Sequence, residues 1–145
     1  MHKNFRHQRR LESHIDETVR IASIVQKGMT TGRSSYVEMR SLDRLTNHNI
    51  KTKVTALKKS FKINAELEDL LTKVVQAVSD GYTKVLTPNG IVRESELDRL
   101  LSIDADIVMC LGMIEPEKSQ KMREVVAALK ELAEERKKLV DSLKA

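Results

Sequence analysis

The sequence predicts an all-α fold, an antiparallel helical bundle of about five helices with a long, heptad-patterned C-terminal helix. Apolar residues recur at spacings of three and four along most of the chain, which is the period of an amphipathic helix. Capping residues, glycines and a proline interrupt that period at positions typical of helix ends. With 145 residues, of which 40% are hydrophobic and 3% aromatic, we expect a single helical domain over residues 1–145 with an aliphatic core.

The first two expected helices form a hairpin over residues 1–62. One apolar face runs with helical period from about residue 8 to residue 27, and Gly28 then marks the end of that helix. Ser35 and Glu38 have the spacing of a capping box, in which each side chain accepts a hydrogen bond from an otherwise unpaired backbone amide. A second helix should therefore start directly after Ser35.

Weak and strong helix signals alternate through the middle of the chain. The second helix should bend at residues 47–49, where Asn, His and Asn replace the apolar pattern. A third helix should open at Asn64, a good capping residue, and end at Gly81. Residues 82–92 lose the helical period around a proline–glycine turn, which predicts an irregular loop or a short hairpin.

Two helices are expected in the last third of the chain. Ser95 and Asp98 mark the start of the fourth, whose apolar face Asp104 interrupts; we expect a break there, with Asp104 capping a short helix to Met113. Pro116 suits the first position of the final helix, because proline there loses no intrahelical hydrogen bond.

The final helix carries an apolar stripe that steps by three and four residues for three heptads. Two interpretations stay open, because neighbouring apolar residues widen the stripe: packing inside a globular bundle, or a coiled coil with another chain. Arg136 is a polar residue within the stripe and needs an acidic partner or water. The candidate partner and self-association residues are Met122, Val125, Leu129, Leu132, Arg136, Leu139 and Leu143.

The charge of the chain is divided unequally between its two segments. Residues 1–62 contain 14 Lys and Arg against five Asp and Glu, a net charge of +9, whereas residues 63–145 contain 12 against 16, a net charge of −4. This asymmetry predicts either an anionic partner for the basic helical hairpin or attraction between that hairpin and the acidic segment.

Basic residues of the second helix fall within about 80° of one another at about 100° per residue, opposite its apolar residues. Such a stripe is a solvated face with ion pairs inside the chain, or a surface that neutralises the phosphates of DNA or RNA, or one that meets an acidic protein or membrane surface. Arginines near the first helix extend it. The candidate nucleic-acid-binding residues are Arg6, Arg10, Arg40, Arg44, His48, Lys51, Lys58 and Lys62.

No motif for chemistry is evident, so we expect no enzyme, no catalytic residue, no cofactor and no metal site. His7 and His14 have a spacing that metal ligands share, but ordinary surface histidines explain it better. The few aromatics are scattered, which argues against a stacking platform for single strands. Cys110 in apolar surroundings predicts a buried, inert thiol, and the absence of a membrane-length apolar run predicts a cytoplasmic protein.

The leading functional hypothesis is a small non-enzymatic helical adaptor that self-associates and binds nucleic acid through the basic helix surface, in the manner of DNA-packaging, partition or regulatory accessory proteins. The alternative is a protein-directed helical interaction module, such as an assembly chaperone, inhibitor or scaffold subunit, without a nucleic-acid role. The expected partners are a second copy or a helical protein, and DNA or RNA at the basic N-terminal half.

Overall fold

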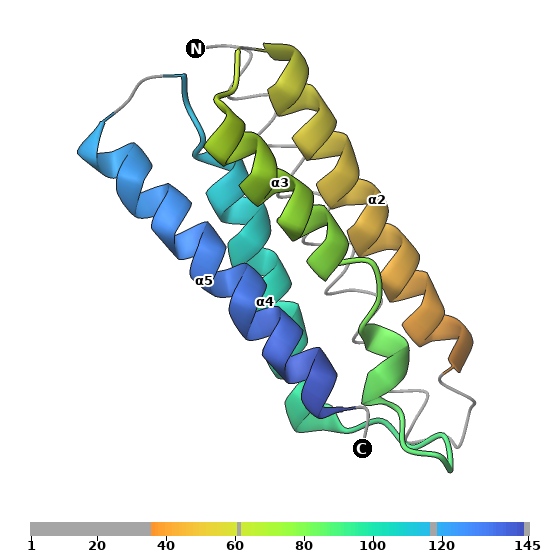
Figure 1. Cartoon of the computed structure of the whole chain (residues 1–145). Coiled ribbons are helices and arrows are strands. Elements are labelled where there is room, and N and C mark those ends of the chain that lie inside the picture. Colours follow the sequence, from red (N-terminus) through yellow and green to blue (C-terminus); the bar gives the residue numbers. More distant parts are fainter. Residues whose placement is uncertain (1–35, 61, 117–118, 144–145) are drawn as a thin grey trace.

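The computed structural model describes residues 36–60, 62–116 and 119–143. This part of the chain is helical and contains no strand, which confirms the all-α class. The helix expected at residues 8–27 lies outside the described residues, so the count of five is not confirmed. The elements are α2 (Tyr36–Ser60), α3 (Ala65–Ala77), the 3-10 helix η1 (Tyr82–Val85), α4 (Glu94–Gly112) and α5 (Gln120–Ser142) (Figure 1).

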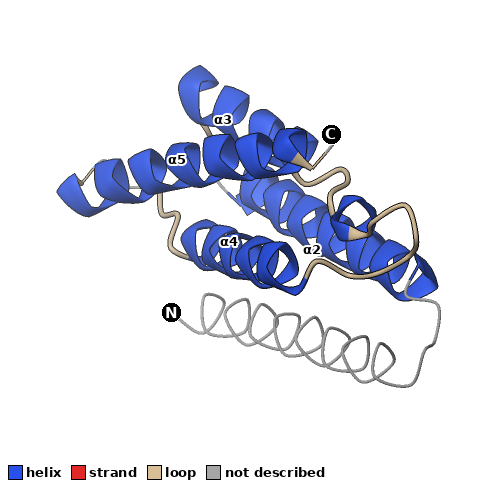
Figure 2. Ribbon diagram, turned by 90° about the horizontal axis from the view of Figure 1, so that it is seen from below, coloured by secondary structure: helices blue, strands red, loops and turns tan. Residues whose placement is uncertain are grey.

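The four α-helices pack in two layers. Figure 2 shows α3 and α5 in one layer above α2 and α4 in the other, and consecutive helices run in opposite directions in Figure 1. Contacts join α2 to α3, α3 to α5, α5 to α4 and α4 to α2, so α3 and α4 lie diagonally across the bundle. The chain between them, which includes η1, therefore has to cross one end of the bundle.

One aliphatic core fills the space between the layers. Each helix contributes fully buried side chains, among them Met39 of α2, Leu71 of α3, Ile107 of α4 and Leu129 of α5. Burying a side chain of this size contributes roughly 1.5–3 kcal/mol to stability. The amphipathic patterns thus position the helices by burying one face of each.

One predicted helix start is confirmed, that of α3. Ser35, the expected cap of α2, lies outside the described residues, so its capping box stays a prediction. The backbone N–H of Leu67 donates to the Asn64 side chain at 2.8 Å, so Asn64 caps α3 as its type predicts.

Two other expectations about helix ends are wrong. α4 is continuous across Asp104, because it buries an apolar face along its whole length. α2 stays helical through residues 47–49, and the bend expected there stays a prediction. The final helix begins at Gln120 rather than at Pro116, with Ser119 as its cap: the Met122 N–H donates to the Ser119 hydroxyl at 3.1 Å.

Residues 82–92, predicted to be an irregular loop or a short hairpin, begin with the 3-10 helix η1 and continue as an irregular connection. Leu86 and Val92 form one isolated antiparallel bridge and no strand extends from it within these residues. Gly90 has a φ of 79°, the left-handed conformation that favours glycine in a turn.

Candidate nucleic-acid interface

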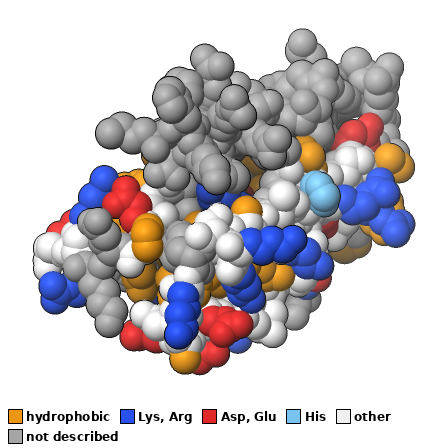
Figure 3. All heavy atoms as spheres, turned by 90° about the horizontal axis from the view of Figure 1, so that it is seen from above, with side chains coloured by type: hydrophobic (Ala, Val, Ile, Leu, Met, Phe, Trp, Pro, Cys, Tyr) orange, Lys and Arg blue, Asp and Glu red, His pale blue; other side chains and the backbone are white. Residues whose placement is uncertain are grey.

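The predicted basic stripe of α2 is exposed. The residues of the stripe lie on one face of α2 and just beyond the C-terminal end of this helix, and all of them are exposed. Figure 3 shows a face of the molecule on which Lys and Arg side chains lie beside a histidine. The exposed members are Arg40, Arg44, His48, Lys51, Thr55, Lys58 and Lys62. We call this set, without Thr55, the basic face; Arg6 and Arg10 lie outside the described residues.

The packing of α2 explains why this face points outward. The opposite side of the helix buries Leu42, Ile50, Val54 and Leu57 against the rest of the bundle. Lys53 lies between the two sides, and burial lowers the pKa of its amine. The helix therefore fixes the basic residues in a row along about 27 Å, at about 1.5 Å per residue from Arg40 to Lys58.

Ion pairs with the acidic segment do not fix the position of the basic face. Among the residues that the structure describes, ion pairs join Lys84 to Asp80 and Arg136 to Asp104, and no residue of the basic face takes part in one. Within the described residues, the positive charges of the basic face are not neutralised by an ion pair.

The N-terminal part of the basic face forms one wall of a shallow pocket of about 320 Å³. The opposite wall comes from the chain between α3 and η1 and from η1 itself. Two arginines, an aromatic ring and several hydrogen-bonding side chains thus share one hollow, which we call the α2–η1 pocket. It is lined by Tyr36, Arg40, Asp43, Arg44, Asn47, Ser79 and Thr83.

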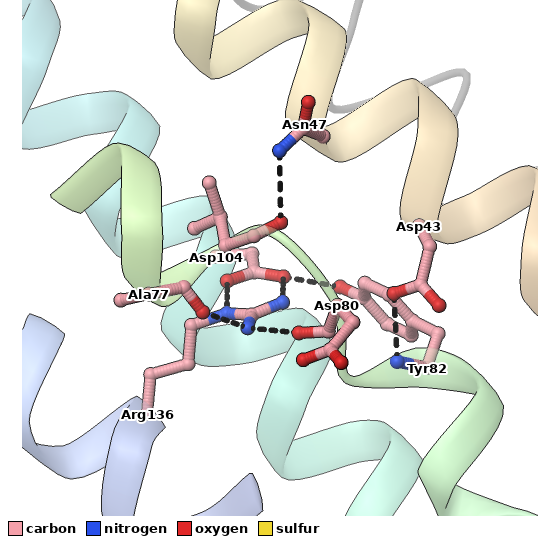
Figure 4. Close-up of polar contacts among 8 residues, drawn as sticks. Asp43, Asn47, Ala77, Asp80, Tyr82, Asp104 and Arg136 are labelled. Atoms are coloured by element: carbon pink, nitrogen blue, oxygen red, sulfur yellow. Dashed lines mark hydrogen bonds and ion pairs between the residues drawn. The ribbon is translucent and has the colours of Figure 1, made fainter.

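Hydrogen bonds from α2 fix the opposite wall of the pocket. The buried Asp43 carboxylate accepts from the backbone N–H groups of Tyr82 at 2.8 Å and Thr83 at 3.2 Å. Asn47 donates from its amide to the Val78 carbonyl at 3.4 Å (Figure 4). Burial raises the pKa of Asp43, against the lowering effect of these two backbone N–H donors.

A second, fully buried polar cluster lies behind this wall. The Arg136 side chain has 0% exposure and donates to both carboxylate oxygens of Asp104, at 2.5 and 3.0 Å. It also donates to the carbonyls of Ala77 and Asp80, at 2.5 and 2.7 Å. The Tyr82 hydroxyl donates to Asp104 at 2.6 Å (Figure 4), so one ion pair joins α5, α4, η1 and the end of α3.

The electrostatics of this cluster favour the charged form of Arg136. Burial, the largest single influence, lowers the pKa of Arg136, but its charge interactions and hydrogen bonds, those with Asp104 first, together raise it. Burial and then the Asp104 charge raise the pKa of Tyr82 well above its usual value, so its hydroxyl stays a hydrogen-bond donor. The Arg136 guanidinium also lies 5.9 Å from the Tyr82 ring centroid, within cation–π range.

The stripe predicted for self-association packs inside the chain. Six of its seven residues are buried and Leu132 is partly buried, so the structure shows the bundle packing of the two alternatives. Arg136 has the acidic partner that the sequence required, Asp104. The heptad spacing therefore reflects contacts of α5 with α3 and α4.

A larger open groove of about 680 Å³ lies between α3 and α5. Its floor includes Leu70, Val126 and Ala133, and its rim carries charges of both signs. It therefore offers no surface of a single charge and stands apart from the basic face.

The described part of the chain contains no group of three or more His, Cys, Asp or Glu residues placed to hold a metal ion. None of the helices described there has the length and apolar character that a membrane span needs. His7 and His14 lie outside this part of the chain. Cys110 is half-buried, and burial raises the pKa of its thiol.

Sequence reasoning missed five of the seven pocket residues. Tyr36 lies four residues before Arg40 and eight before Arg44, a spacing that places the three side chains in one row on a helix. That signal is available from the sequence. Ser79 and Thr83 belong to the connection that crosses the end of the bundle from α3 to α4. The path of this connection depends on how the helices pack, so the local sequence does not predict that these two residues lie next to α2.

Comparison of the chain with protein-family models, with curated proteins and with solved structures finds no significant match.

Proposed function

We propose that this protein is a non-enzymatic helical accessory protein that binds nucleic acid through the basic face of α2. The observation that carries the proposal is that this face is exposed along the helix and takes part in no ion pair within the described residues. Five of its six members are Lys or Arg, and the sixth is His48. Self-association through the α5 stripe is not part of the proposal, because those side chains pack inside the bundle.

The expected binding is strongly salt-dependent. A protein that neutralises phosphates releases counterions, and log Kobs falls with log salt at a slope of roughly −0.9 per contact on duplex DNA. If all five Lys and Arg of the basic face meet phosphates, the slope reaches roughly −4.5. Contacts made by helix side chains with phosphates carry little sequence preference.

The test is fluorescence anisotropy with a labelled random duplex and a labelled single strand, titrated over a range of salt concentrations. The variant Arg40→Glu/Arg44→Glu/Lys51→Glu/Lys58→Glu should lose binding to both probes. The matched control, Lys121→Glu/Arg123→Glu/Lys130→Glu/Lys138→Glu, changes the net charge equally at exposed positions of α5 and should lose far less. Circular dichroism of both variants checks that the helices are intact.

Equal loss in the two variants would mean that net charge, not the basic face, determines affinity. No binding by the parent protein at low salt would reject the proposal. The protein-directed alternative would then be favoured by the α3–α5 groove, whose apolar floor between charged rims suits a partner helix. A charge placed in that floor, Val126→Glu, would then be the variant to compare with the parent for partner binding.

A further inference from the structure

The α2–η1 pocket differs from the rest of the basic face. Along most of α2 the charged side chains lie on an open helix surface, but at Arg40 and Arg44 a second wall faces them. This wall carries the hydroxyl groups of Ser79 and Thr83. A surface that only neutralises a phosphate backbone does not require a second wall. The wall therefore indicates that part of a ligand enters the α2–η1 pocket.

The charges in the pocket favour an anion. Arg40 and Arg44 contribute two positive charges and Asp43 one negative charge, so the lining has a net charge of +1. The Asp43 carboxylate is 8% exposed and accepts from two backbone N–H groups, whereas both arginines are exposed and without an ion pair in the described part of the chain. One helical turn separates the arginines, so both guanidinium groups can reach one phosphate.

An aromatic ring lies next to this pair of arginines. Tyr36 is one turn before Arg40, lines the same pocket and is 52% exposed. The scattered aromatics argue against a platform for several successive bases, but one exposed ring is enough for one base. Bases of every identity can stack on such a ring, since each presents a flat face. A base in a duplex is already stacked and paired, and only an unpaired base is free to lie on Tyr36.

The size of the pocket sets the size of the ligand. Its volume of about 320 Å³ is at the lower end of the roughly 300–1,000 Å³ typical of small-molecule sites. This is room for one nucleotide unit and not for a duplex.

We propose that the α2–η1 pocket binds one unpaired nucleotide of a single strand, with its phosphate between Arg40 and Arg44 and its base stacked on Tyr36. The hydroxyls of Ser79 and Thr83 hydrogen-bond to the same unit. This inference rests on the proposed nucleic-acid function and adds its substrate class: the protein prefers single strands, or unpaired ends and loops, over duplex of equal charge.

The test compares a labelled single strand with a duplex of the same number of phosphates at one salt concentration. The variant Tyr36→Leu should weaken single-strand binding about 5- to 160-fold, the range for losing one stacked base. It should leave duplex binding within about twofold and the salt slope unchanged, because no charge is removed. Tyr36→Phe keeps the ring and should bind as the parent does.

The control is a pair of charges outside the pocket. Lys51→Gln/Lys58→Gln should weaken binding of both probes by similar factors and make the salt slope shallower for both. RNA and DNA single strands are compared in the same titration to show which sugar the pocket accepts.

Tyrosine fluorescence gives a readout at the pocket itself. The chain has no Trp and two Tyr, of which Tyr36 is exposed and Tyr82 is fully buried. Addition of a nucleoside monophosphate should quench the emission of the parent, and Tyr36→Phe should remove that quenching.

The outcomes separate the two proposals. If the parent binds neither probe, both proposals fail. If the parent binds both probes through the basic face and Tyr36→Leu changes neither affinity, the pocket proposal alone is overturned. Quenching that persists in Tyr36→Phe would also overturn it.

Discussion

Replacing Asp104 by Asn should destabilise the protein by about 3–5 kcal/mol, the usual cost of breaking a buried ion pair. Asp104 accepts from the guanidinium of Arg136 through both carboxylate oxygens and from the hydroxyl of Tyr82. Asparagine keeps one oxygen and puts an NH₂ group against these donors. It leaves the 0%-exposed guanidinium charged without its hydrogen-bonded counter-charge.

The loss is large against a total stability of roughly 5–15 kcal/mol for a domain. Urea unfolding followed by circular dichroism measures it, with an unchanged m value showing that the folded and unfolded states keep their compactness. A double-mutant cycle sharpens the test: Arg136→Met removes the charge that Asp104→Asn leaves unpaired. The double variant should therefore be less destabilised than the sum of the single variants, by about 1 kcal/mol or more.

A loss below about 1 kcal/mol for Asp104→Asn, or additive single variants, would refute this account of the buried cluster. The exposed Asp98→Asn on the same helix is the matched control and should fall within about 0.5 kcal/mol of the parent.

Three further predictions follow from the same region. Gly81→Ala should cost about 1–3 kcal/mol in urea unfolding, because Gly81 has a φ of 152° and a Cβ there would lie 3.2 Å from the Arg136 guanidinium. Asn64→Ala should cost about 1 kcal/mol through loss of the α3 cap, measured in the same way. Because the pKa of Asp43 is raised above its ordinary 3.8, the folded state holds this proton to a higher pH than the unfolded chain. The stability of the parent relative to Asp43→Asn should thus fall as the pH rises from 3.8 through the raised pKa, and a rise in that window would contradict the assignment.

The sequence predicts the helices well because each buries one face, and burial with a period near 3.6 residues is visible in the order of the residues. The Asn64 cap follows from local chemistry alone. The basic face was predicted on the same ground, since the side opposite a buried stripe is exposed.

The errors come from partners that are distant in the sequence. Asp104 interrupts an apolar face, and locally it is indistinguishable from a helix cap; it stays inside α4 because Arg136, 32 residues later, neutralises it. The stripe of α5 has the spacing of a coiled coil, and only the position of α3 and α4 shows that its partners belong to the same chain. The sequence did state that Arg136 needs an acidic partner, but it did not identify Asp104.

The α2–η1 pocket could not be predicted either, because its two walls come from segments that are distant in the sequence. The contribution of the buried cluster to this pocket can be measured. The wall that carries Ser79 and Thr83 is held from one side by Arg136, which binds the Asp80 carbonyl, and from the other by Asp43. Asp43→Asn removes a negative charge from the pocket, and this favours the binding of every anionic ligand. The asparagine side chain, however, has a single oxygen and cannot accept hydrogen bonds from both η1 amides, so the wall becomes looser.

The two effects separate in the ratio of affinities. The change of charge affects the affinity for single strand and duplex alike, whereas the change in the wall affects only a nucleotide inside the pocket. Asp43→Asn should therefore lower the preference for single strands without weakening duplex binding. Anisotropy titrations with both probes measure the ratio. An unchanged ratio would show that the position of η1 does not govern binding at the pocket.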